Sequence, residues 1–192
     1  MIGEISKMLA NYDREKLINA ILFFCGHTKY CGITKLFKLL YFLDFEHYKQ
    51  IGRSVTGLDY YAWKMGPVPT RLYNEIPNAL EPDLAERVQF IAIRSKHKNH
   101  FVKIQPKQAF VPKMFSKREI RIMTELAKEY KNSLADDMIE ATHLENLPWH
   151  QVYCVEGNQQ GIISYEYALK KADADLIGYI VKENKEVISN YS

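Results

Sequence analysis

The stretch from Leu36 to Tyr48 (LFKLLYFLDFEHY) most constrains the fold, because its apolar residues cover almost every side of a helix. A helix that is apolar nearly all round packs against neighbours on more than one side. The sequence therefore predicts a central helix that Thr34 caps and that runs to about Ile51, before Gly52. The apolar run is far shorter than the ~20 residues needed to cross a bilayer, so no membrane association is expected.

Asp44 interrupts this apolar helix. A buried carboxylate needs a partner, and the candidates are Arg53, Lys38 and a backbone N–H group. We favour a structural ion pair over a catalytic carboxylate, because no nucleophile or substrate pocket is indicated nearby.

Helices and short strands are predicted on both sides of the central helix. The expected elements are a helix from Asp13, as its N-cap, to Cys25; a strand over 57–64; a rigid turn over 65–69 (MGPVP); a helix over 70–80 that Pro77 ends or kinks; a helix from Ser116 to about Tyr130; a helix from Ser133 to about His143; a short turn or helix at Pro148; a loop over 157–161; a short helix capped by Ser164; and a helix over 173–185. Ser116 and Glu119 form a capping-box pattern, and Leu134, Met138, Ile139 and Thr142 are expected to point inward.

A basic β-hairpin is predicted from two alternating segments, 87–94 and 100–105, joined by SKHKN. Residues 84–121 hold ten basic and two acidic side chains, whereas residues 133–192 hold four Lys and ten acids. Arg94, Lys96 and Lys98 could contact phosphates as the wing of a winged-helix protein. The acidic C-terminal third and the pI of 8.6 weigh against DNA as the main partner.

The fold class that follows is α+β and mainly α-helical, a helical core with a small antiparallel sheet that includes the basic hairpin. No P-loop, dinucleotide, GxSxG or HExxH pattern occurs, so neither an enzyme nor a bound cofactor is expected. Cys25, His27 and Cys31 lack a fourth ligand at a standard spacing, so we predict no metal site. The odd count of three cysteines favours reduced thiols in the cytoplasm. His143 is more simply a helix-terminal histidine packed under Trp149 than a general base.

An ordered set of residues resembles the Panacea domain of SocA-like antitoxins. The matching residues are Lys38 to Phe42 and Asp44; Gly52, Arg53, Val55, Thr56 and Gly57; Tyr60; Gly66, Pro67, Val68, Pro69 and Tyr73; and Thr142, His143, Pro148 and Trp149. Leu43 and Phe45 depart from the family, where a small and a polar residue are common. The resemblance covers about residues 13–153. We therefore expect one antitoxin domain over 1–155, with 156–192 a helical extension packed on it.

The resemblance implies a bacterial or phage-encoded antitoxin that neutralises a cognate toxin by binding it or by delivering it to a protease. The proline-rich turn would present Tyr60, Trp63, Lys64 and Met65 on a rigid platform, which favours binding because little freedom is lost. The basic residues Arg94, Lys96 and Lys98 would steer an acidic toxin surface. We expect a second set to hold the fold: Lys38, Asp44, Gly52, Arg53, Gly57, Gly66, Pro67, His143 and Trp149.

Overall fold

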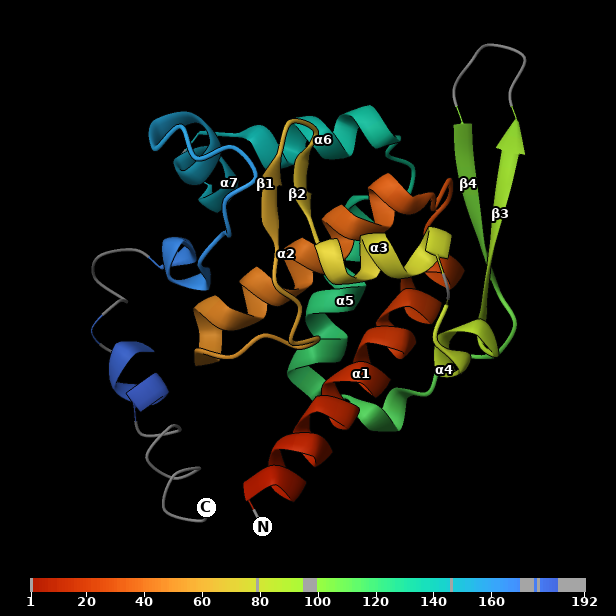
Figure 1. Cartoon of the computed structure of the whole chain (residues 1–192), viewed down its shortest axis with the longest axis horizontal. Coiled ribbons are helices and arrows are strands. Elements are labelled where there is room, and N and C mark those ends of the chain that lie inside the picture. The colour runs from red at the N-terminus through yellow and green to blue at the C-terminus, as the bar shows by residue number, and fades with distance from the viewer. Residues whose placement is uncertain are drawn as a thin grey trace.

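The computed structural model describes residues 2–78, 80–94, 100–145, 147–169, 175 and 177–182. Helices gather around one central helix, the β3–β4 hairpin lies at one edge, and the β1–β2 hairpin packs against α2 and α6 (Figure 1). The elements are α1 (Ile2–His27), α2 (Ile33–Ile51), β1 (Tyr61–Trp63), β2 (Gly66–Val68), α3 (Thr70–Asn78), α4 (Pro82–Ala85), β3 (Val88–Arg94), β4 (His100–Pro106), η1 (Pro112–Met114), α5 (Lys117–Glu129), α6 (Ala135–His143), α7 (Pro148–His150), η2 (Gln151–Val155) and η3 (Tyr165–Ala168). The predicted class, α+β and mainly helical, is confirmed.

The central position of α2 follows from its apolar surface. It contacts α1, α5, α6, β2, β4 and η3, so it has neighbours on more than one side. The helix ends as predicted at Gly52, which adopts a left-handed conformation (φ 68°) and donates its N–H to the Tyr48 carbonyl (2.8 Å). Its N-cap is Gly32 and not Thr34, because the helix begins two residues earlier than predicted, at Ile33.

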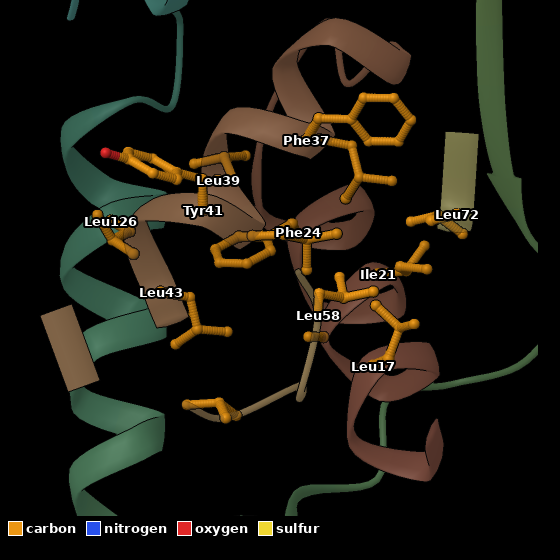
Figure 2. Packing of buried hydrophobic residues seen from close by; sticks show 14 of the residues in the cluster. Leu17, Ile21, Phe24, Phe37, Leu39, Tyr41, Leu43, Leu58, Leu72 and Leu126 are labelled. Carbon is orange, nitrogen blue, oxygen red and sulfur yellow. The ribbon is translucent and has the colours of Figure 1, made fainter. Parts of the chain in front are cut away.

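Helix α1 starts much earlier than predicted. The sequence preceding Asp13 contains no proline, so the helix continues through Asp13 back to Ile2. Asp13 is therefore an interior residue of α1 and not its N-cap, and its carboxylate faces Arg53. The predicted apolar stripe is buried, and Figure 2 shows Leu17, Ile21 and Phe24 of α1 facing the centre of the core.

The proline-rich segment is a strand and not the turn that the sequence predicted. β1 and β2 form an antiparallel hairpin in which Tyr61 pairs with Val68 and Trp63 with Gly66. The reversal takes place at Lys64 and Met65, just before the prolines. The φ angle that proline prefers is compatible with a short edge strand, so Pro67 is tolerated in β2. The predicted strand over 57–64 is shortened to β1.

The second predicted hairpin is confirmed, with β3 and β4 paired from Val88 opposite Pro106 to Arg94 opposite His100. Residues 95–99, with Lys96 and Lys98, lie outside the described residues, as does the side chain of Arg94. Within the described part of the chain, the two hairpins form separate two-stranded sheets.

Local capping signals explain several helix starts. Ser116 accepts from the Glu119 N–H and Glu119 accepts from the Ser116 N–H, which confirms the predicted capping box. Ser164 caps η3, also as predicted. Ser133 does not cap α6, whose N-cap is Leu134. Leu134 is 54% exposed, so its predicted inward position is wrong, whereas Met138 and Thr142 are buried.

Residues beyond 155 contact the helical core. The ring of Tyr165 packs on Phe45 with centroids 4.4 Å apart, its hydroxyl donates to the Leu58 carbonyl, and Ile162 forms a β-bridge with Tyr61. The part of 173–185 that the structure describes is helical. Among the described residues, no helix has the combination of length and apolarity needed to span a bilayer.

Candidate functional site

Four signature residues meet where α2, β2 and α6 come together. Lys38 of α2 is 2% exposed and donates to the Pro67 carbonyl of β2 (2.8 Å). Gly66 has a φ of 92°, and a Cβ on it would lie 2.7 Å from both Lys38 Nζ and Thr142 Oγ1. We call Lys38, Gly66, Pro67 and Thr142 the lysine cluster. Only a glycine lets the three elements approach this closely.

A stack of rings extends the lysine cluster toward α7. The imidazole of His143 lies flat on Trp149, with centroids 3.8 Å apart, and Trp149 stacks on Tyr153. Trp149 Nε1 donates to the carbonyl of Trp63 (2.9 Å) and so joins α7 to the β1–β2 hairpin. Burial and the nearby charge of Lys38 lower the pKa of His143, which favours a neutral imidazole.

Asp44 binds backbone N–H groups, which were among its predicted partners, and not Arg53 or Lys38 in the ion pair that we favoured. Asp44 is 0% exposed and accepts hydrogen bonds from the backbone N–H groups of Val55 and Thr56 (2.8 Å each), from the Thr56 hydroxyl and from the Tyr60 hydroxyl (2.8 Å). Burial raises the pKa of Asp44 to about 6, and these hydrogen bonds oppose the rise. The carboxylate therefore organises the chain that follows α2.

Arg53 is not the counter-ion of Asp44. Its side chain is 52% exposed and lies 3.3 Å from Asp13 instead. The backbone turns away from α2 at Gly52, which carries the guanidinium outward while the next amides turn back to Asp44. Gly57 also has a left-handed conformation (φ 66°) and lies so close to Asp13 that a Cβ would come within 2.9 Å of its carboxylate.

These signature groups face one another and the backbone. Lys38, Asp44 and His143 line none of three well-formed cavities in the described part of the chain, those beside Phe42, Arg14 and Tyr48. The polar atoms of the signature residues hold α2, the β1–β2 hairpin, α6 and α7 in fixed positions relative to one another. The arrangement is suited to positioning a surface.

One buried cation in this framework had no signal in the sequence. Lys35 is 1% exposed and donates to the carbonyls of Lys29 (2.8 Å) and Ser133 (2.8 Å), with that of Lys131 at 3.4 Å. It ties the α1–α2 loop to the α5–α6 loop. The three carbonyls come from segments about a hundred residues apart in the chain, so residue spacing could not indicate this contact.

The predicted partner-contact residues are divided between core and surface. Tyr60 is fully buried against Asp44, which leaves its ring no surface to offer a partner. Trp63 is half-buried and packs edge-on against Tyr73 (4.9 Å), whereas Lys64 and Met65 are exposed at the turn. We call Trp63, Lys64, Met65 and Tyr73 the hairpin tip.

Acids from other elements neutralise part of the basic stretch 84–121. Arg87 forms two hydrogen bonds with Glu15 of α1, the shorter at 2.6 Å, and Arg121 lies 3.3 Å from Glu125. Lys107 donates to the carbonyl of Ala85. The net charge of the sequence segment therefore overstates the positive charge that this face presents to a nucleic acid.

Cys25, His27 and Cys31 do not converge. The sulfurs of Cys25 and Cys31 are 3.6 Å apart, but His27 stacks on Phe23 and its Nδ1 faces the Phe23 carbonyl (2.8 Å). Among the described residues, no group of three His, Cys, Asp or Glu side chains could hold a metal ion.

The lysine cluster predicts an unusual pH dependence of stability. Burial lowers the pKa of Lys38 to about 7, whereas an unfolded lysine titrates near 10.4. Above pH ~7 the unfolded chain therefore binds a proton that the folded chain has released, and the free energy of unfolding rises with pH. Between pH ~7 and pH ~9 we expect Lys38 to contribute a rise of about 2 kcal/mol.

Urea denaturation at the two pH values, with Lys38→Met and the exposed-site control Lys128→Met, measures this contribution. Lys38→Met is expected to lose the rise and Lys128→Met to keep it. Equal pH dependence in the wild type and Lys38→Met would show that the folded protein keeps Lys38 charged.

Comparison with known proteins finds a family match that includes these signature residues. A family model described as Antitoxin SocA-like, Panacea domain, matches residues 36–150. The match spans α2 to α7 and includes the lysine cluster, Asp44 and Trp149, while α1 lies outside it. Neither the curated proteins nor the solved structures yielded a match.

Proposed function

The chain belongs to the SocA-like antitoxin family with the Panacea domain, and on this premise we propose that it neutralises a cognate toxin by binding it directly. The observation that carries the proposal is the family match over residues 36–150. The proposal is supported by the burial of most signature side chains, which hold the fold together, so that other residues at the surface are left to contact a partner.

The hairpin tip is the contact surface that we propose first. Met65 is 54% exposed, in the turn between β1 and β2, and the lysine cluster and the Trp149–Trp63 hydrogen bond hold these strands. Tyr73 is 42% exposed and stands on α3, where its ring packs against that of Trp63. A large side chain presented by a rigid hairpin loses little conformational freedom on binding. Methionine and aromatic residues are also enriched in protein interfaces.

Growth rescue tests the function. The neighbouring gene would be expressed alone and together with this chain. We expect its product to arrest growth when expressed alone and co-expression of this chain to restore growth. Rescue in hosts both with and without the major cytoplasmic proteases would support direct binding, whereas rescue that needs a protease would support delivery. We place the encounter in the cytoplasm, in keeping with the three free cysteines. Absence of rescue by the folded protein would contradict neutralisation of that product.

A point substitution tests the hairpin tip. Met65→Asp places a charge in the proposed interface, and we expect it to weaken binding to the purified toxin by roughly tenfold or more without changing the thermal midpoint. Leu134→Asp is the matched control, because Leu134 is also 54% exposed and lies away from the hairpin tip, at the N-cap of α6. Isothermal titration calorimetry measures both. Equal affinity for the two variants would place the interface elsewhere.

A further inference from the structure

A groove runs between α2 and α5 and is also lined by Leu147 and Pro148, where α7 begins. Its volume is about 260 Å³. The apolar part of its lining includes Phe42, Leu126, Tyr130, Leu147 and Pro148. The rings of Phe42 and Tyr130 are parallel, with centroids 5.4 Å apart, and form one wall. The space is suited to one large apolar side chain.

The rim of this groove is acidic. Glu46, Glu125 and Glu129 line it together with a single cation, Lys49. Lys49 pairs with Glu46 (3.0 Å) and Arg121 with Glu125 (3.3 Å), but both pairs are exposed and therefore weak. Glu129 interacts with the Tyr130 hydroxyl, and burial together with this contact raises the pKa of Tyr130. Carboxylates thus surround an apolar floor, which is complementary to an apolar side chain flanked by basic residues.

A buried hydroxyl also reaches this groove. Tyr41 is 1% exposed and lines the groove. Its hydroxyl lies near the backbone of Trp149 but makes no hydrogen bond of normal geometry with the described residues. Figure 2 shows the hydroxyl beside Leu126 of α5, pointing away from the α1 residues of the core. A buried polar group without a partner is costly, and a bound segment that supplied a hydrogen bond would remove that cost.

We propose that the groove between α2 and α5 binds a basic amphipathic helix of the toxin, with one large apolar side chain inserted above Phe42 and Tyr130. The inference rests on the proposed function and adds a second contact surface to the hairpin tip. A helix fits a groove between two helices by placing apolar anchors one turn apart along one face. Its lysines or arginines lie against the glutamates of the rim and accelerate the encounter at low salt.

A defined peptide tests the groove without a known toxin. The probe is a synthetic dye-labelled helical peptide with one tryptophan on its apolar face flanked by lysines, and the same peptide with glutamates is its control. Fluorescence anisotropy is expected to show binding of the lysine peptide only, weakening as ionic strength rises from about 0.05 M to about 0.5 M. Amide chemical-shift changes should centre on α2 and α5. No binding of the lysine peptide at low salt, or shifts centred elsewhere, would overturn the proposal.

Matched charge reversals identify the rim. Glu125→Lys/Glu129→Lys alters two exposed acids four residues apart on α5, and Asp136→Lys/Glu140→Lys alters an equivalent exposed pair on α6 that does not line the groove. The α5 variant is expected to bind the lysine peptide roughly tenfold more weakly and the α6 variant like the wild type. Tyr41→Phe should also weaken binding, with a thermal midpoint equal to or above that of the wild type, because it removes an unpartnered hydroxyl. Equal affinity in all variants would overturn the proposal.

Growth rescue separates this inference from the proposed function. If the wild-type chain does not neutralise the neighbouring gene product, the proposed function fails. If the wild type and the folded α5 variant rescue growth equally well, the groove fails as the toxin site while neutralisation stands. Rescue by the wild type and the α6 variant, with loss in the folded α5 variant, supports both.

Discussion

Replacing Asp44 with alanine is expected to lower the free energy of unfolding by about 3–5 kcal/mol. The carboxylate accepts from Val55 N–H, from the N–H and hydroxyl of Thr56, and from the Tyr60 hydroxyl. Alanine leaves these buried donors without an acceptor, and each such donor costs about 1–3 kcal/mol before the site relaxes. Urea denaturation followed by circular dichroism measures the loss.

Asp59→Ala is the matched control, because Asp59 is an exposed aspartate in the same connecting segment. Its effect is expected to stay within about 0.5 kcal/mol, as for most surface substitutions. A loss for Asp44→Ala no larger than that of Asp59→Ala would show that water or a rearranged backbone replaces the carboxylate.

Gly66→Ala is expected to lower the free energy of unfolding by about 3 kcal/mol or more. Two costs combine at this position. The φ of 92° is strained for any residue with a Cβ, and that Cβ would meet Lys38 Nζ and Thr142 Oγ1 at 2.7 Å. Lys38 cannot move aside cheaply, because it is buried and its ammonium donates to the Pro67 carbonyl. The thermal midpoint and the urea midpoint should both fall.

Gly157→Ala separates the two costs. Gly157 also has a positive φ (64°), but nothing lies within 4 Å of the position of its Cβ. It should therefore show the conformational cost alone, about 1 kcal/mol. If the two alanine variants lost the same stability, the close approach at Gly66 would not contribute, and the lysine cluster would be looser than its distances indicate.

Patterns carried by neighbouring residues predicted most of the elements. The all-round apolar pattern of 36–48 predicted the central α2, Gly52 predicted its end, and Ser116 with Glu119 predicted the start of α5. These signals act within one or two helical turns, so the residues that decide the structure are adjacent in the sequence. The same local reasoning misplaced the start of α1, because a residue favoured as an N-cap is also tolerated inside a helix when its carboxylate finds a cation such as Arg53.

The partners of buried polar groups could not be predicted from neighbouring residues alone. The sequence offered Arg53, Lys38 and a backbone N–H group as partners of Asp44 and favoured an ion pair. The fold supplies two backbone N–H groups, as one of these candidates, together with two hydroxyls. The sequence predicted a turn over 65–69, whereas in the structure Gly66–Val68 pair with β1 and form a strand. Tyr60 was predicted to stand on the contact platform but is buried, because residues in an extended segment alternate between two faces and the sequence does not say which face is covered.

The sequence by itself determined that the chain has a central apolar helix, a mainly helical α+β fold, a capped α5 and the signature of the SocA-like family. Tertiary structure alone decided that Lys38, Gly66 and Thr142 meet, that Lys35 holds two distant loops, and that α2 and α5 leave an acidic groove between them. The physical reason is the distance along the chain between the residues that interact. Helix periodicity and capping depend on neighbours a few residues away, whereas a buried charge or a groove depends on which distant segments the folded core brings side by side.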